Sequence, residues 1–225
     1  MTRHALFFLL ATTLGLTACT IDDTAAPDSE ADTDTDTDTD TDTDTDTDTD
    51  TDTDTDTDTM DGYTVTMETS HGTMVILLDP VNAPITVENF VTYVDEGFYD
   101  GTDGLGATTF HRVIEDFMIQ GGGQTVDGTL KSTHDPIVLE ADNGLSNDRG
   151  TIAMARTGMP DSATTQFFVN HVDNPGLDST GNNDGYAVFG ALTEGLDVLD
   201  AIAVLAPPGS EAPAEDVIIT SVTRD

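Results

Sequence analysis

A tract of alternating aspartate and threonine runs without interruption from residue 32 to residue 59. It contains no apolar side chain, so burial cannot offset the entropy lost when its backbone is ordered. Alternation with a period of two is typical of a strand, but here both alternating residues are polar and neighbouring carboxylates repel. We therefore expect an extended, disordered spacer, and a folded core must be built from other residues.

The residues before this tract have the pattern of an export signal. A short, positively charged start is followed by an apolar run over residues 5–16, which is too short for a membrane-spanning helix. The next residues, Leu16-Thr17-Ala18-Cys19, resemble the bacterial lipobox, in which the cysteine is acylated and the peptide bond before it is cut. The alternative is an ordinary signal peptide with an incidental cysteine.

We accordingly predict three parts of the chain. Residues 1–18 form a lipoprotein signal peptide, residues 19–60 form a lipid-anchored linker, and residues 61–225 form one folded domain. Acyl chains on Cys19 would hold the protein stably at a membrane, since each buried methylene contributes about 0.8 kcal/mol. We expect it in the cell envelope, in the outer membrane, on the periplasmic or surface side.

The charge balance excludes some partners. The chain has 44 acidic and 6 basic residues, a formal net charge of -38. Nucleic acid is excluded, because its phosphates require Lys and Arg, and a single cysteine excludes an internal disulfide. The acidic tract lacks the glycine that an EF-hand loop needs at its sixth position, so we predict no metal site, with weak, diffuse cation binding as the alternative.

From Asp61 onward, mixed apolar and polar residues predict a mainly β domain with one core. A hairpin is expected from β-rich runs at 63–69 and 73–79, and helices are expected over 84–96 and 196–205. Further strand-like runs lie at 108–114, 117–121, 137–139, 151–156, 166–170, 187–192 and 217–222. Many short strands with two helices favour a barrel or a sandwich.

One stretch, residues 109–122 (TFHRVIEDFMIQGG), places Arg112 among apolar residues and ahead of a Phe-Met pair and a glutamine. A guanidinium beside an apolar surface can donate a hydrogen bond next to a bound apolar ring. The alternatives are a solvated strand arginine and, for Phe110 and Phe167, plain core packing. Four more motifs follow the same order as in one known family: FYDGT at 98–102, GTIAMART at 150–157, SATTQFFVN at 162–170 and YAVFG at 186–190.

These motifs resemble the cyclophilins, the peptidyl-prolyl cis/trans isomerases, and in particular their bacterial branch. The resemblance covers about residues 63–223. It implies a closed eight-stranded antiparallel barrel capped by two helices, a monomer, and no cofactor or metal. It also implies proline-containing peptides and unfolded proteins as partners, and behind an export signal it predicts help in folding exported proteins.

The resemblance also implies site residues. Arg112 would donate to the prolyl nitrogen in the twisted state of the peptide bond, with Gln120 and Phe117 as further catalytic residues. The substrate-binding set would be His111, Met118, Ala155, Arg156, Thr157, Gln166, Phe168, Leu177 and Tyr186.

Two departures from the family pattern bear on this site. Residues 103–107 are inserted between two motifs, and Gly176 stands where the family often has a pocket tryptophan. The missing aromatic wall keeps a second hypothesis open, a non-catalytic module or chaperone that binds proline segments.

Overall fold

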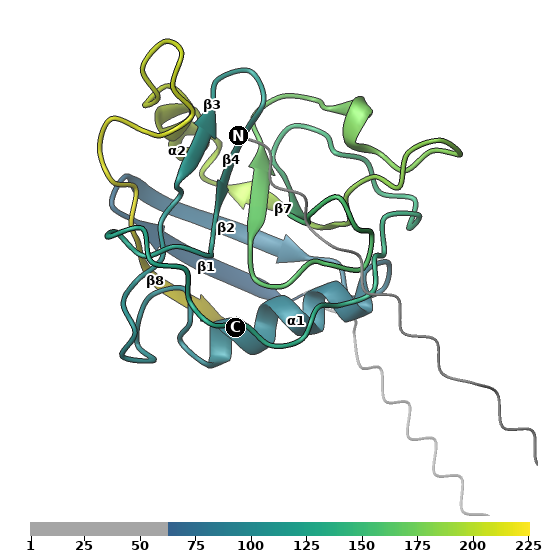
Figure 1. Cartoon of the computed structure of the whole chain (residues 1–225), viewed down its shortest axis with the longest axis horizontal. Helices are drawn as coiled ribbons and strands as arrows, with labels where there is room; N and C mark the ends of the chain where they lie inside the picture. Colours follow the sequence, from purple (N-terminus) through teal and green to yellow (C-terminus); the bar gives the residue numbers. More distant parts are fainter. Residues whose placement is uncertain (1–62) are drawn as a thin grey trace, which may run out of the picture. The chain divides into compact units, whose positions relative to one another are not determined.

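The computed structural model describes residues 63–225 (Figure 1). The predicted signal peptide, the linker and Cys19 lie outside the described residues. The strands are β1 (Thr64–Thr69), β2 (Gly72–Leu78), β3 (Arg112–Ile114), β4 (Met118–Gly121), β5 (Thr151–Met154), β6 (Phe167–Asn170), β7 (Val188–Glu194) and β8 (Ile219–Arg224). The helices are α1 (Pro84–Asp95), α2 (Leu196–Ala203) and the short 3₁₀ turn η1 (Pro175–Leu177).

The eight strands form one antiparallel sheet in the order β3-β4-β6-β5-β7-β2-β1-β8. The end strands β3 and β8 share no ladder within residues 63–225, so the prediction of a closed barrel is wrong and the sheet is an open half-barrel. Next to these edges, an isolated bridge joins Thr109 to Ile218. The reason lies in β3, where the Val113 amide donates to the carbonyl of Glu211, in the loop before β8, at 2.6 Å.

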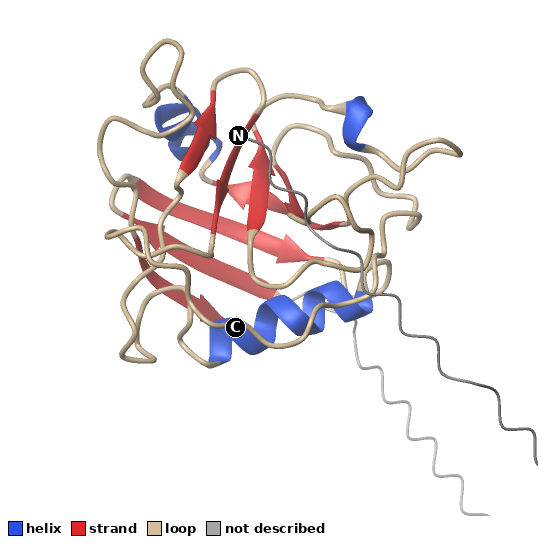
Figure 2. Cartoon of the chain, viewed as in Figure 1, coloured by secondary structure: helices blue, strands red, loops and turns tan. Residues whose placement is uncertain are grey.

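The two helices lie at opposite ends of the curled sheet (Figure 2). In α1 the apolar spacing predicted from the sequence is confirmed, since Val87, Phe90, Val91 and Val94 are all buried. Gly97 follows the helix with φ +68°, a conformation that glycine adopts without strain. Neither helix among the described residues is long and apolar enough to cross a membrane.

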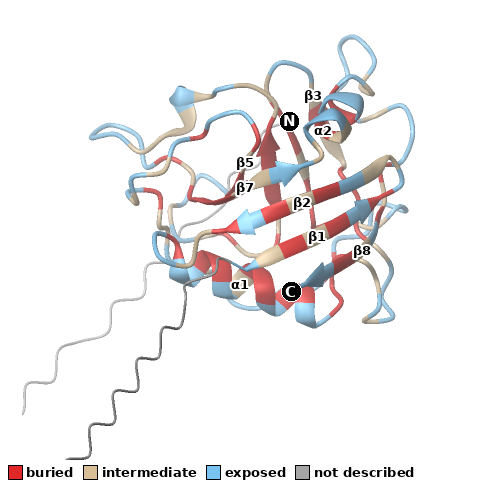
Figure 3. Ribbon diagram, turned by 180° about the vertical axis from the view of Figure 1, so that it is seen from behind, coloured by how far each residue is buried: buried red, intermediate tan, exposed pale blue. Residues whose placement is uncertain are grey.

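The core fills the concave side of the sheet. Side chains of β1 alternate between buried and less buried positions, with Val65 and Met67 fully buried (Figure 3). Phe110 and Phe167, predicted as core residues, are both 0 % exposed. The run at 137–139 is not a strand. Ile137 makes only one bridge, to Ala163, and the Leu139 amide donates to the Asp161 carboxylate and not to a neighbouring strand. Thus the core set was predictable, and this edge segment was not.

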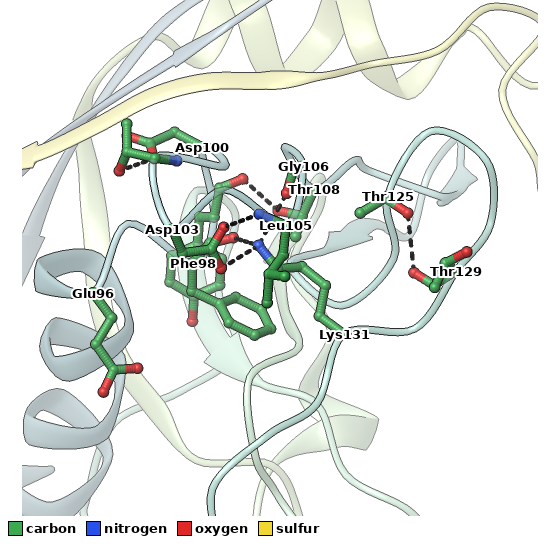
Figure 4. Close-up of polar contacts among 12 residues, drawn as sticks. Glu96, Phe98, Asp100, Asp103, Leu105, Gly106, Thr108, Thr125, Thr129 and Lys131 are labelled. Carbon is green, nitrogen blue, oxygen red and sulfur yellow. Dashed lines mark hydrogen bonds and ion pairs between the residues drawn. The ribbon is translucent and has the colours of Figure 1, made fainter.

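The loop at 103–107, which the sequence predicts to be an insertion and which we call the inserted loop, is held by a buried lysine (Figure 4). The Lys131 ammonium donates to the backbone carbonyls of Phe98 and Gly106, and it forms an ion pair with Asp103 at 2.7 Å. It also lies 4.4 Å from the centre of the Phe98 ring. An ammonium has three donors, and each has a protein acceptor here. The insertion is therefore held by an internal cation.

Candidate active site

A cavity of about 170 Å³ opens on the outer side of the sheet, over β3, β4 and β6 and beside the residues that follow β5. Its lining consists of nine residues, all in the set predicted from the sequence: Arg112, Phe117, Met118, Gln120, Ala155, Arg156, Phe168, Leu177 and Tyr186. A second cavity of about 150 Å³ shares Gln120, Ala155 and Arg156 with it and is also lined by Thr157, Ser162, Thr164 and Gln166. We call them the first and the second pocket.

One predicted residue, His111, lines neither pocket. Its Nδ1 atom is buried, and it is the only such side-chain atom without a hydrogen-bond partner in residues 63–225. Burial lowers the pKa of this imidazole, and the nearby Arg112 charge lowers it further. A backbone hydrogen bond at Thr109 raises this pKa in part, and the net effect favours the neutral form of His111. Cys19, the other predicted functional residue, lies outside the described part.

Strand register brings the pocket residues together. Arg112 of β3 is opposite Gln120 of β4, and Gln120 is in turn opposite Phe168 of β6. Because side chains alternate between the two faces of a sheet, these three point outward together. Their neighbours Val113 and Ile119 point the other way and are 0 % exposed in the core. One side of each strand therefore builds the fold and the other builds the site.

The first pocket has a firm apolar base. Met118, Phe168 and Val188 are buried in a small cluster separate from the main core, against which Phe117 and Leu177 pack. The Phe168 and Tyr186 rings meet edge to face, with centroids 5.5 Å apart, a favourable aromatic geometry. These walls match the shape and polarity of a small apolar ring.

A chain of polar contacts crosses this base. The Arg112 Nε donates to Glu211 Oε2 at 2.7 Å, and its Nη1 donates to Gln120 Oε1 at 3.4 Å. Gln120 donates in turn to Gln166 Oε1 at 2.9 Å. The hydrogen bond from Arg112, with the charge of the guanidinium, lowers the pKa of Glu211. The guanidinium is thus held on two sides, and it has more donors than these two bonds use.

Sequence reasoning missed Glu211 and the polar groups that hold the pocket walls. Glu211 is 99 residues from Arg112, in a loop with no motif. The Asn174 amide donates to the Phe117 carbonyl at 2.9 Å and to the buried Asn170 side chain at 2.8 Å. Asparagines near turns are common, so nothing in the sequence distinguishes these from others.

A larger apolar groove, of about 460 Å³, lies over β2 and β7. Its only ionisable lining residues are the carboxylates Asp79 and Asp148. It offers no cationic donor beside its apolar walls. The smaller first pocket, which combines a guanidinium with an apolar base, is therefore the stronger candidate for chemistry.

Residues 64–224 match the family model of the cyclophilin type peptidyl-prolyl cis-trans isomerases. The chain belongs to this family. Peptidyl-prolyl cis-trans isomerase cyp18 of Streptomyces antibioticus is 53 % identical over 165 residues, which cover 70 % of this chain and 96 % of that protein. Peptidyl-prolyl cis-trans isomerase B of Escherichia coli is 49 % identical over 166 residues, 71 % of this chain and 98 % of that protein.

The fold agrees with solved cyclophilin structures. A cyclophilin type peptidyl-prolyl cis-trans isomerase from Cryptosporidium parvum was crystallised in the presence of the dipeptide Ala-Pro. It superposes on this chain with a TM-score of 0.59 at 26 % sequence identity, and the match covers 72 % of this chain and 98 % of the Cryptosporidium chain. Every residue of the two pockets falls within the 64–224 family match. The cyclophilin assignment therefore includes the whole candidate site.

Proposed function

We propose that this cyclophilin accelerates cis/trans rotation about X-Pro bonds, with the proline ring in the first pocket and Arg112 as the donor to the prolyl nitrogen. The observation that carries the proposal is the placement of Arg112, a half-buried cation that lines a pocket whose base is formed by Met118 and Phe168. Gln120 holds the guanidinium, and Phe117, Met118 and Phe168 hold the ring. Ala155, Thr157, Gln166, Leu177 and Tyr186 line the rest of the groove for the peptide backbone.

The chemistry requires no covalent step by the protein. A peptide bond rotates over a barrier of about 18–20 kcal/mol because conjugation is lost in the twisted state. In that state the prolyl nitrogen becomes pyramidal and gains a lone pair that can accept a hydrogen bond. A fixed donor aimed at this nitrogen binds the twisted state better than the planar one, and such differential binding is what lowers a barrier.

Turnover of a proline peptide tests the proposal. Exchange between cis and trans forms, followed by NMR, should be faster with the protein than without it. Arg112→Ala should reduce kcat/KM by about 10²–10³-fold, the usual effect of removing one transition-state donor. Arg149→Ala is a matched control, because Arg149 lines neither pocket and pairs with Asp200.

Two outcomes would contradict isomerase activity. The first is an unchanged rate in Arg112→Ala. The second is a wild-type rate equal to the uncatalysed one, although the peptide still binds. The second result would favour the non-catalytic proline-segment binder, for which the open Gly176 position argues, since nothing lies within 4 Å of an added Cβ there.

We further propose that the domain acts on exported proteins as a monomer tethered to a membrane, in the outer membrane, by lipid on Cys19. The lipobox-like Leu16-Thr17-Ala18-Cys19 and the acidic spacer behind it support this. Cys19→Ser should move the protein from the membrane fraction to the soluble fraction, and mass spectrometry should show acyl groups on the wild-type cysteine only. Retention of the variant in the membrane would contradict the anchor.

A further inference from the structure

Arg156 differs from the other cations of the domain. Residues 63–225 contain five lysines and arginines and 25 aspartates and glutamates. Four of the five cations form ion pairs with carboxylates at 2.7–2.8 Å, namely Arg112, Lys131, Arg149 and Arg224. Among the described residues, Arg156 has no carboxylate within ion-pair distance. In so acidic a domain, an unpaired cation calls for a reason.

Neutral groups hold the Arg156 guanidinium in place. Its Nε donates to the Gly185 carbonyl at 2.9 Å, and its Nη1 donates to the Thr157 carbonyl at 3.0 Å. Its central carbon lies 4.7 Å from the centre of the Tyr186 ring, in the range of a cation–π contact. None of these contacts neutralises the charge. Arg156 is therefore a fixed positive charge with donors left over for a ligand.

The position of Arg156 makes this charge available to a bound peptide. It lines both pockets and, with Gln120 and Ala155, forms their shared boundary. No carboxylate lines either pocket. Asp161, five residues further along the chain, accepts a hydrogen bond from the Leu139 amide. Asp184, which precedes the Gly185 bound by Arg156, is exposed. The side chains that complete the second pocket are hydroxyls and an amide, which can also bind a carboxylate.

We propose that the second pocket is a subsite for an acidic side chain of the client, and that Arg156 is the residue that selects it. The inference rests on the proposed function, since the proline must occupy the first pocket. An extended chain advances about 3.3 Å per residue, and alternate side chains share one face. The selected Asp or Glu should therefore lie two residues from the proline in the client sequence.

A matched series of peptides tests this with the full chain. Proline peptides carry Glu, Gln or Lys at each of three positions before and after the proline, and kcat/KM is measured by NMR exchange. At one position the order should be Glu, then Gln, then Lys. A partly exposed charge pair should give a Glu-to-Gln ratio of about two to five. The ratio should approach one at about 1 M salt, where the screening length falls to roughly 3 Å.

Variants assign the preference to its source. Arg156→Gln should bring the Glu-to-Gln ratio to one, and Arg156→Lys should restore part of it, because the charge remains without the planar fork. Arg149→Gln should keep the full ratio. Equal rates for the three peptides at every position, or a ratio that survives in Arg156→Gln, would overturn the inference. A loss of rate shared equally by all peptides in Arg156→Gln would also overturn it, since it would indicate a purely structural arginine.

The same data separate this inference from the proposed function. If the wild-type protein does not accelerate exchange of the Gln peptide above the uncatalysed rate, the proposed isomerase activity itself is wrong. If the Gln peptide is accelerated but the ratio is one, only the acidic subsite fails.

Discussion

Arg112 and Lys131 each form an ion pair of 2.7 Å, but the two pairs differ in burial. The side chains of Arg112 and Glu211 are 36 % and 61 % exposed, whereas those of Lys131 and Asp103 are 2 % and 15 % exposed. The first pair lies at the candidate active site. The second holds the inserted loop (Figure 4). Separation alone therefore does not show what a pair does.

The difference lies in the donors that remain. Lys131 has two carbonyls and one carboxylate for its three donors, so nothing is left for a ligand. Arg112 is held at Nε and Nη1 only. A saturated, buried cation stabilises the fold, while a positioned but unsaturated one can bind a substrate. The following substitutions test this contrast, from the largest expected effect to the smallest.

Lys131→Met should have the largest effect on stability. Removing one partner of a buried ion pair leaves the other charge uncompensated, which typically costs about 3–5 kcal/mol. Urea unfolding should show this loss. The turnover per folded molecule should change little, because Lys131 lines neither pocket.

The double variant Asp103→Asn with Lys131→Met is the control. It removes the stranded carboxylate as well as the ammonium, so part of the lost stability should return. If the single variant were as stable as the wild type, the buried pair would not hold the insertion.

Arg112→Lys should lower the activity but hardly change the stability, the reverse of Lys131→Met. The charge remains, but an ammonium cannot bind Glu211 and Gln120 at once in the planar arrangement of a guanidinium. We expect kcat/KM to fall by about tenfold or more, in line with the loss of a positioned donor. The free energy of unfolding should change by no more than about 0.5 kcal/mol, as is usual for surface positions. Full activity in this variant would show that charge alone suffices.

The sequence predicted the helix α1 and the residues of the first pocket, because both depend on short stretches of the chain. The apolar spacing of residues 84–96 located α1 to within one residue of its observed end at Asp95. The motifs contained eight of the nine residues that line the first pocket, and the ninth, Leu177, was predicted from the resemblance to the family. Glu211 and Asp103, however, are two of 25 acidic residues in residues 63–225, and each is selected by chain folding across loops. Periodicity shows which face a strand buries, but it does not show which loop replaces a strand at the edge.

Glu211→Gln should have a smaller effect on activity. The pair with Arg112 is one of the two contacts that hold the guanidinium, but exposed ion pairs are weak, so kcat/KM should fall by about two- to fivefold at neutral pH. The hydrogen bond from Arg112 lowers the pKa of Glu211 below its usual 4.5. A carboxyl whose pKa is depressed keeps its contribution above 4.5 and loses it as the pH falls through the lower value.

A pH profile of kcat/KM in wild type and Glu211→Gln checks this. The wild-type advantage should be constant above the usual carboxyl range and should vanish in more acidic solution. An advantage that disappears between pH 6 and 8 would point to another titrating group.

Substitution of His111 should have the smallest effect, a change in how the free energy of unfolding depends on pH. Among residues 63–225, His111 forms no ion pair, unlike Arg112 and Lys131, and it is partly buried. Burial lowers its pKa from 6.5, so the folded protein resists protonation that the unfolded chain accepts. Between the two pKa values the unfolded state binds more protons, and stability therefore rises with pH. Relative to His111→Gln, the wild type should lose stability as the pH falls below about 6.5, in urea unfolding at pH 5 and pH 7. A difference that is the same at both pH values would show that the pKa of His111 is not lowered in the folded state.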